Sequence, residues 1–371
     1  MKRLHVIGAG LAGLAAAVKA ASQGLKVSLY EGASAAGGRA RSFFDETLQC
    51  RIDNGNHLVL SGNHSVGQYL DLIGARDAFH VPPRAVFPFI DLASGERWAV
   101  QPGKGRSPLW IFKRGRGVPG TALRDIWDAL KVRYFSRGKR LQECVRRERP
   151  LYSRFWEPLT LAALNTPADL ASAWLLGAVL RESFFLGEAA CRPMVAKEGL
   201  SESLVDPALA YLKTKDAAVA FQTRLTAMEN DGGRVTALVF GNRRVPLEAG
   251  EAVVLALPPW QVKEILPIVS VPETFHAIVN VHFKVKTPRA FAETPFVGIL
   301  NGTAQWVFVR ENIASVTVSA ADALAEESAD AIAGKTWPEA AQALGLTGPM
   351  PPLRVIKEKR ATFSQTPEAL R

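Results

Sequence analysis

Apolar and polar residues along the first thirty positions have the spacing of a β-strand followed by an amphipathic helix. Leu4, Val6 and Ile7 form a short apolar run that is typical of a buried strand. After a glycine-rich turn, apolar residues recur at helical spacing: Leu11, Leu14, Ala15, Ala17, Val18 and Ala21. Gly24 ends this predicted helix, and residues 26–30 predict a second strand. The pattern is that of a βαβ unit.

The pattern after this unit predicts a further strand and then a helical region. Residues 51–75 predict a strand, a turn and a helix. Residues 76–190 are predicted to be mainly helical, with joints rich in proline and glycine at 82–83, 102–105 and 115–120.

The last part of the chain returns to strand-like patterns. We expect a helix over 204–212 and a strand over 219–225, followed by a turn and further strands over 231–259. Alternating apolar and polar residues within 263–315 predict a small antiparallel sheet.

The turn between the first strand and helix contains the spacing G-x-G-x-x-G. Gly8 allows the tight turn, Gly10 lets the backbone approach a pyrophosphate, and Gly13 lets the helix pack closely on its strand. The helix begins at Leu11 and Ala12, whose N–H groups face the phosphates together with the positive end of the helix dipole. The pattern alone is equally common in structural turns, but here strand, glycines, helix and strand follow in order.

Glu31 stands at the end of the second predicted strand, where a carboxylate can accept hydrogen bonds from ribose hydroxyls. The same negative charge would repel a 2'-phosphate, which disfavours NADP. A dinucleotide site is therefore expected.

A second glycine pair follows this acid. Gly37, Gly38, Arg39 and Arg41 would bring N–H donors and guanidinium groups beside a diphosphate and an extended flavin. The alternative is a solvated loop with unrelated charges. The stretch resembles the G-G-R-x-x-S loop of the flavin amine oxidase and carotenoid desaturase superfamily, and this resemblance implies FAD.

Composition limits the class of protein. The chain has 371 residues, of which 48% are hydrophobic and 22% charged, so it is large enough for two lobes with separate cores. No apolar run is long enough for a membrane-spanning helix, and no signal peptide is expected before the first strand. Cys50, Cys144 and Cys191 are widely spaced and fit buried thiols in a reducing cytoplasm.

The net charge of +10 is concentrated in residues 104–149, which hold 14 basic and four acidic residues. Apolar side chains lie between these charges: Trp110, Ile111, Phe112, Leu123, Ile126, Trp127, Leu130, Tyr134 and Phe135. Such a mixture suits an interfacial helix on an anionic membrane, and we expect a cytoplasmic protein bound peripherally to the inner face of the cytoplasmic membrane. A solvated helical face is the alternative. Nucleic acid is not expected as a partner, because no nucleic-acid module accompanies the patch.

Longer segments make the resemblance more specific. The segments "FWEPLTLAALNTPADLASAWLLGAVLRESFF", "KEGLSESLVDPALAYL", "IDNGNHLVL" and "AQWVFVR" are similar to the squalene-associated FAD-dependent desaturase family. The resemblance runs along the whole chain. It implies removal of the hydroxyl of hydroxysqualene by hydride transfer from reduced FAD, which yields squalene and water in hopanoid synthesis.

The resemblance implies an α/β fold in which a Rossmann-like FAD-binding domain carries an inserted α+β substrate domain. We expect residues 1–75 and 195–262 in the discontinuous FAD-binding domain. Residues 76–194 would form a helical region facing substrate and membrane, and 263–371 a β-rich substrate region that begins the return to the FAD domain.

One departure from the family concerns the end of the chain. Family members usually continue with a strand, a Gly-Asp turn and a helix whose N-terminus approaches the flavin, and the sequence stops at Arg371 before such a segment. The expectation is that the sequence is incomplete or that flavin binding is weakened.

Further cofactor contacts follow only from the resemblance. Leu225, at the end of the predicted strand 219–225, corresponds to a backbone contact with the adenine, and ordinary core packing is its alternative. Pro258, in "LALPP", corresponds to a segment that crosses near the cofactor, although a proline pair also terminates strands.

The expected chemistry needs an acid, a dry apolar pocket and aromatic faces that stabilise a delocalised cation. His57 is the first candidate acid because its titration range suits proton donation, and Asp53 is the second. Either residue could instead only orient the backbone. Candidate pocket walls are Phe155, Trp156, Trp174, Phe184, Phe185 and Trp306, of which only some should touch substrate.

Other functions remain open at this level. A related polyene desaturase or amine oxidase-like enzyme would need the same pocket, and a non-catalytic membrane-associated flavin or lipid-binding protein would need only the binding sites. No metal site is expected, because no cluster of metal-ligating residues stands out. The oligomeric state is not predicted.

Overall fold

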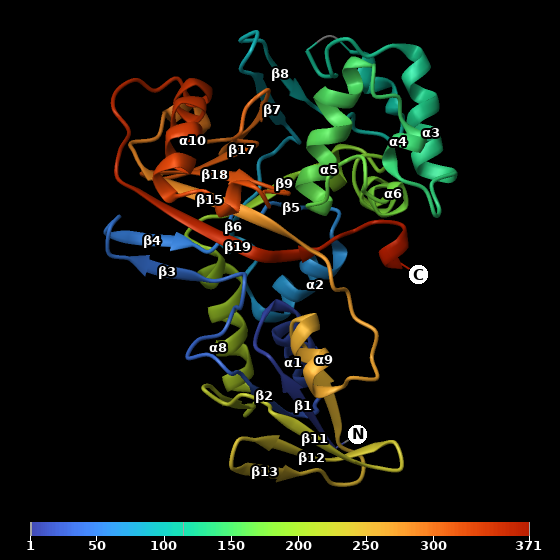
Figure 1. The fold of residues 1–371 in the computed structure, drawn as a ribbon, viewed down its shortest axis with the longest axis vertical. Coiled ribbons are helices and arrows are strands. Elements are labelled where there is room, and N and C mark those ends of the chain that lie inside the picture. The colour runs from blue at the N-terminus through green and yellow to red at the C-terminus, as the bar shows by residue number, and fades with distance from the viewer. Residues whose placement is uncertain (1, 114, 371) are drawn as a thin grey trace.

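The computed structural model describes residues 2–113 and 115–370, which form two lobes joined by several chain crossings (Figure 1). The lower lobe contains a parallel sheet with helices, and the upper lobe contains a larger sheet beside a group of helices. Within the described residues no helix combines the length and the apolar character needed to cross a bilayer.

The lower lobe is built on four parallel strands in the order β10-β2-β1-β14. Their bounds are β1 Arg3–Ile7, β2 Lys26–Tyr30, β10 Ala218–Ala220 and β14 Ala252–Leu255. Successive side chains of each strand point to opposite faces of the sheet. Both faces are covered by apolar clusters, so the strands are buried between two apolar layers. The α/β fold class and the Rossmann-like sheet expected from the sequence are confirmed.

Three helices cover one face of this sheet: α1 Leu11–Ser22, α2 His64–Ile73 and α8 Asp206–Thr214. Leu14, Leu70 and Leu212 are fully buried in the core that these helices share. A π-helical turn, Ser201–Val205, precedes α8, so the predicted helix 204–212 begins slightly later in its regular form. The other face packs on a meander of β11 Ala227–Asp231, β12 Arg234–Phe240 and β13 Arg243–Pro246, while α9 Pro259–Ile265 follows β14.

The upper lobe contains a seven-stranded sheet in the order β19-β15-β18-β17-β16-β7-β8. Its strands are β7 Phe87–Asp91, β8 Arg97–Val100, β15 Phe275–Lys284, β16 Phe296–Leu300, β17 Trp306–Arg310, β18 Ile313–Val318 and β19 Leu353–Phe363. All neighbours are antiparallel except β7 and β16. α10 Ala329–Leu344 packs on this sheet through Ile332, Ala333 and Trp337.

Short strands and helices link the lobes. β3 Ser42–Asp45 pairs with β4 Cys50–Asp53, and β9 Pro193–Ala196 lies between β5 Val59–Leu60 and β6 Phe79–His80. The helices beside the large sheet are α3 Ile126–Tyr134, α4 Leu141–Cys144, α5 Glu157–Leu164, α6 Ala173–Glu182 and α7 Glu188–Cys191. Cys50, Cys144 and Cys191 are free thiols, and Cys144 and Cys191 are buried as predicted, whereas Cys50 is only half-buried.

The expectation that residues 76–190 are mainly helical is wrong for their first part. β7 and β8 form a hairpin that joins the large sheet, and β7 pairs with β16 from the far end of the chain. The alternation of Phe87, Phe89 and Asp91 has strand periodicity, but the intervening apolar Pro88 and Ile90 hide it.

The predicted strand 219–225 is also too long. β10 ends at Ala220, because Gln222 adopts a positive φ of 52° and its N–H turns to the Ala33 carbonyl. Leu225 therefore lies in a loop and not at a strand end. Its side chain is buried in an apolar cluster with Ile7 and Tyr30, as the core-packing alternative predicts.

Candidate flavin and substrate site

The glycine turn between β1 and α1 has the geometry that a dinucleotide needs. Gly8 has a φ of 99°, which favours glycine, and a side chain at Gly13 would meet the Gly8 carbonyl oxygen at 1.8 Å. A Cβ at Gly10 would meet no protein atom within 4 Å, so the space beside this residue is open. Gly10 caps α1 without any side-chain hydrogen bond, which leaves the first helical N–H groups to a ligand.

Glu31 lies directly against this turn. Its Oε2 accepts a hydrogen bond from the Ala9 N–H at 2.7 Å, and its Oε1 accepts one from the Ala33 N–H at 2.8 Å. The carboxylate of the second strand is thus fixed next to the glycines. This juxtaposition fits the ribose and diphosphate of one nucleotide.

The second glycine pair lies beside the first turn. Gly37 donates its N–H to the Ala9 carbonyl at 2.8 Å, and a side chain at Gly38 would lie 3.4 Å from the Gly10 Cα. Arg39 donates to the Ala361 carbonyl of β19, whereas the Arg41 side chain is exposed. The structure therefore brings the two glycine motifs together, with Arg39 directed toward the upper lobe.

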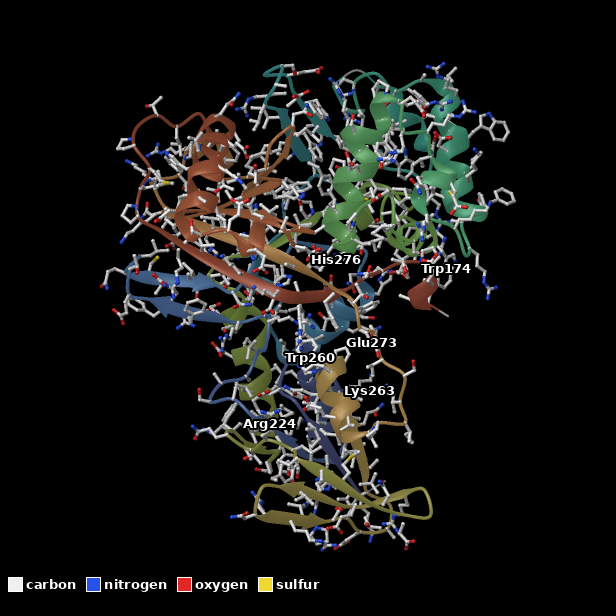
Figure 2. All side chains as sticks on the ribbon, viewed as in Figure 1. Trp174, Arg224, Trp260, Lys263, Glu273 and His276 are labelled. Carbon is white, nitrogen blue, oxygen red and sulfur yellow. The ribbon has the colours of Figure 1, made fainter. Side chains whose placement is uncertain are left out.

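Pro258 is the N-cap of α9, one turn beyond β14. The preceding Ala256 carbonyl would lie 2.5 Å from a side chain at Gly8, so the segment closes over the glycine turn. In Figure 2, Trp260 at the start of α9 lies where the two lobes meet, and its ring is packed edge-on against Phe275 at 5.3 Å. Both predicted functions of Pro258, near a cofactor and at a strand end, are compatible with this position.

A large apolar cavity opens in the upper lobe beside the Asn56–Leu60 segment. Its volume is about 510 Å³. Aromatic rings form much of its wall: Phe87, Phe89, Phe155, Phe184, Trp306 and Phe308. We refer to it as the reaction cavity.

The strands of the large sheet hold these rings in place. Gly298 lies opposite Phe89, and a side chain there would meet the Phe89 ring at 2.5 Å, so glycine lets that ring lie over β16. The Phe89 and Trp306 rings then contact edge to face, with centroids 5.3 Å apart. Phe87 contacts Phe184 at 5.6 Å, which joins the sheet to the helices.

Five of the six predicted wall residues line a cavity. Phe155, Phe184 and Trp306 line the reaction cavity, and Phe155, Trp156, Phe184 and Phe185 line a second cavity beside it. Trp174 lines neither of these two cavities and is 42% exposed, so the structure does not support it as a wall of either one. α6 buries Leu176, Gly177 and Leu180 on its inner face, and Trp174 lies on the other face (Figure 2).

Sequence reasoning missed Phe87, Phe89, Phe308 and Asn56. The first two were hidden by the helical interpretation of their region. Alternation along "WVFVR" indicated a strand at Phe308, but not which of its faces would meet a cavity.

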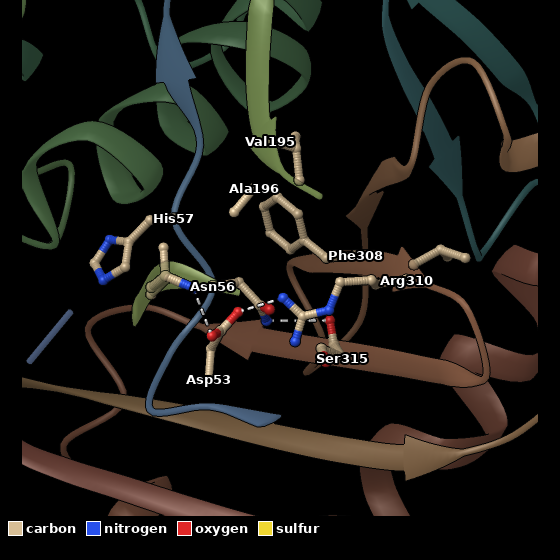
Figure 3. A pocket seen from close by; sticks show the side chains of 10 residues that line it. Asp53, Asn56, His57, Val195, Ala196, Phe308, Arg310 and Ser315 are labelled. Atoms are coloured by element: carbon tan, nitrogen blue, oxygen red, sulfur yellow. Dashed lines mark hydrogen bonds and ion pairs between the residues drawn. The ribbon is translucent and has the colours of Figure 1, made fainter. Parts of the chain in front are cut away.

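Asp53 ends β4 and is held by several donors. One carboxylate oxygen is 2.7 Å from Arg310 Nη1, and the other accepts from Ser42 Oγ at 2.6 Å and from the Leu200 N–H at 2.9 Å. Figure 3 shows the Asp53 and Arg310 side chains meeting across a small polar pocket of about 30 Å³. Both carboxylate oxygens are thus engaged as hydrogen-bond acceptors, and the contact with Arg310 ties β4 to β17.

His57 lines both this polar pocket and the reaction cavity (Figure 3). The His57 residue is exposed by surface area, but many protein atoms lie around its ring, and the desolvation that they cause lowers the pKa of His57 from its usual range. The nearby Asp53 carboxylate opposes this shift, and Arg39 adds to it. At neutral pH the ring is therefore mainly neutral, which works against a simple imidazolium acid.

The parallel sheet, the glycine turn with its acid, and a cavity lined by aromatic rings together indicate a dinucleotide-dependent oxidoreductase. Residues 11–345 match the model of the flavin containing amine oxidoreductase family. The chain belongs to this family, and FAD is its cofactor.

The chain is similar in sequence to several proteins over nearly its whole length. The chain is 41% identical to a hydroxysqualene dehydroxylase of Rhodopseudomonas palustris over 99% of its own length and 87% of that protein. It is 39% identical to a hydroxysqualene dehydroxylase of Sinorhizobium fredii over 99% of its length and 88% of that protein. A solved putrescine oxidase variant has a TM-score of 0.66 at 16% identity, covering 98% of this chain and 87% of that one, which shows the shared fold.

Proposed function

We propose that this protein removes the hydroxyl of hydroxysqualene by hydride transfer and gives squalene and water. The observation that carries this proposal is the similarity along 99% of the chain to hydroxysqualene dehydroxylases. The aromatic reaction cavity supports it independently, because its walls suit a hydrocarbon substrate.

The proposed FAD site consists of the two glycine motifs and Glu31. Gly10 would offer open space to the diphosphate, Leu11, Ala12 and Gly13 would offer helix N–H groups, and Glu31 would accept from the ribose. When bound, reduced FAD supplies the hydride. Arg39 connects this loop to β19, whose Thr362 lines the reaction cavity, so cofactor loop and cavity adjoin.

The reaction breaks the allylic C–O bond, forms a C–H bond and consumes one proton, which leaves with the hydroxyl as water. The aromatic rings of the cavity wall would face the delocalised cation that forms when the hydroxyl departs. These walls lower the barrier by stabilising positive charge where it develops.

We assign different functions to the two candidate acids. Of the two, His57 lines the reaction cavity and can form a hydrogen bond with the departing hydroxyl. Asp53 is a positioning residue, because its oxygens are held by Arg310, Ser42 and the Leu200 N–H. If His57 donates as imidazolium, turnover should increase as the pH falls below its ordinary range, since its pKa is lowered.

Anaerobic single-turnover measurements test this function. Reduced holoenzyme is mixed with hydroxysqualene, and we expect squalene to appear as the flavin is oxidised. His57→Asn should slow this step and flatten its pH profile while retaining FAD. Failure of the wild-type holoenzyme to form squalene would overturn the proposed reaction.

We also propose that the surface around α3 binds an anionic membrane. Leu123, Trp127, Tyr134 and Phe135 are exposed there by 62–72%. Basic side chains are exposed beside them, namely Arg124, Lys131, Arg137 and Lys139, while Arg114 lies outside the described residues. Figure 1 shows α3 at the rim of the upper lobe, away from the parallel sheet. Exposed apolar groups with surrounding cations suit a bilayer surface of negative charge.

Cosedimentation with vesicles tests the membrane proposal. Binding should be strong with vesicles that contain phosphatidylglycerol, weak with phosphatidylcholine alone, and weakened by salt. Trp127→Ala with Phe135→Ala should reduce binding without loss of FAD. Equal binding by this double variant and the wild type would contradict the assigned surface.

A further inference from the structure

A second cavity of about 300 Å³ lies between α3 and the aromatic residues beside α5 and α6. Its wall is mainly apolar and includes Trp110, Ile111, Ile126, Ala129, Leu130 and Phe185. The cavity belongs neither to the predicted FAD site nor to the reaction cavity. We call it the side chamber.

The side chamber and the reaction cavity share two wall residues, Phe155 and Phe184. Their rings meet edge to face with centroids 5.6 Å apart, and both side chains are buried. The two cavities are thus separated by a thin aromatic partition. These two rings are the part of the wall that both cavities share.

Some polar groups of the chamber wall are engaged by protein partners, whereas Arg133 Nε and Trp156 Nε1 are buried without a hydrogen-bond partner among the described residues. Asp125 accepts from the Ala122 N–H at 2.8 Å and pairs with Arg149 at 2.6 Å. The Arg133 guanidinium lies over the Phe185 ring, 4.8 Å from its centroid. The pairing with Arg149 reduces the capacity of Asp125 to bind a charged ligand, and the mainly apolar wall suits a hydrocarbon.

The far side of the chamber is formed by residues of the α3 surface. Tyr134 lines the chamber and is also exposed, while Ile126 and Leu130 line it and are half-buried. The apolar side chains Trp127 and Leu123 are exposed on the same segment. A hydrocarbon leaving a bilayer at α3 would therefore meet apolar surface up to the partition.

We propose that the side chamber binds a linear isoprenoid chain, so that substrate extends from the α3 surface past Phe155 and Phe184 into the reaction cavity. This inference rests on the proposed function. Hydroxysqualene is a linear triterpene alcohol with its hydroxyl near the middle, so two long apolar arms leave the reacting carbon. The reaction cavity holds the centre and one arm, and the chamber holds the other arm.

Filling the chamber tests the arm site by kinetics. Ala129→Phe places a ring in the chamber without altering the reaction cavity, and Ala331→Phe on the exposed side of α10 is the matched control. For Ala129→Phe we expect kcat/KM to fall about tenfold with hydroxysqualene and to stay unchanged with a secondary allylic alcohol that has one arm removed. The control should match the wild type with both alcohols. Equal losses with both alcohols, or no loss with either, would overturn the proposal.

A crystallographic measurement tests, independently of turnover, whether a hydrocarbon binds in the side chamber. Crystals of the holoenzyme are soaked with 1-bromododecane, and anomalous scattering locates the bromine. We expect a bromine site between α3 and Phe185 in the wild type and none there in Ala129→Phe. Bromine confined to the reaction cavity of the wild type would refute the proposed binding of a hydrocarbon in the side chamber. Absence of squalene formation with bromine in the chamber would instead overturn the proposed function alone.

Discussion

The glycine turn and the reaction cavity differ in how the chain builds them. The turn is made of backbone from residues close in sequence, in which Gly8, Gly10 and Gly13 leave room for a ligand and for each other. The cavity is made of side chains from β7, α5, α6 and β17, which are far apart in the chain. One site depends on the absence of side chains, and the other depends on their packing.

This difference determines how each site tolerates substitution. A methyl group added in the turn would collide with backbone atoms or occupy the space of the ligand. No flexible side chain is present there that could move aside. A changed wall residue in the cavity can be accommodated partly by neighbouring rings, so its effect depends on charge and volume.

The largest effect is expected in the turn. Gly13→Val would force a side chain into the Gly8 carbonyl, and we expect complete loss of FAD together with loss of the native fold of the lower lobe. Gly10→Ala meets no protein atom, so the melting temperature of the apoprotein should not change while FAD affinity falls at least about tenfold. Flavin absorbance and calorimetry measure both. Normal FAD affinity in Gly10→Ala would place the diphosphate elsewhere.

A smaller effect is expected in the cavity. Ala163 lines the reaction cavity and is exposed, so Ala163→Glu should fold and retain FAD. The apolar substrate would then meet a carboxylate at the cavity wall, and kcat/KM for hydroxysqualene should fall at least about tenfold, or ~1.4 kcal/mol. Ala331→Glu on α10 is the control for the added charge. Unchanged turnover by Ala163→Glu would mean that substrate reacts outside this cavity.

A third prediction concerns the sheet below the cavity. His282 on β15 is buried, its Nδ1 lies 2.6 Å from Ser315 Oγ, and burial lowers its pKa to about 4, with Asp53 opposing and Arg310 assisting the shift. Below its ordinary pKa of 6.5 the unfolded chain takes up a proton that the native state refuses. Stability is therefore lost as the pH falls from about 6.5 to about 4, by roughly 3 kcal/mol.

Urea unfolding at several pH values checks this group. His282→Gln should lose less stability than the wild type over the same pH interval, although it is expected to be less stable at neutral pH. Parallel pH profiles for the two proteins would show that His282 does not govern the acid sensitivity of the fold.

The sequence predicted elements correctly where local spacing determines the backbone. The order of strand, glycines, helix, strand and acid in residues 3–31 appears in the structure as β1, α1, β2 and Glu31. The prediction from sequence failed for β7, whose strand conformation depends on pairing with a distant strand. β7 takes its place because β16, more than 200 residues later, pairs with it, and nothing within 87–91 indicates that partner.

Side-chain positions at the site show the same limit. Aromatic residues near Phe155 and Phe184 were predicted as walls from their composition, but Trp174 in the same region lies outside because of its face on α6. Likewise, the sequence around Asp53 allowed it to be proposed as an acid, because Arg310, which pairs with it, lies on a strand far away in the sequence.

By itself, the sequence determined the nucleotide-binding turn, because glycine spacing restricts backbone conformation over a few residues and needs no distant contact. It also determined the concentration of cations between 104 and 149. Only the tertiary structure decided which rings enclose the reaction cavity, that a side chamber adjoins it, and that Asp53 is held by Arg310. These features arise from packing between distant segments, whose geometry no local pattern contains.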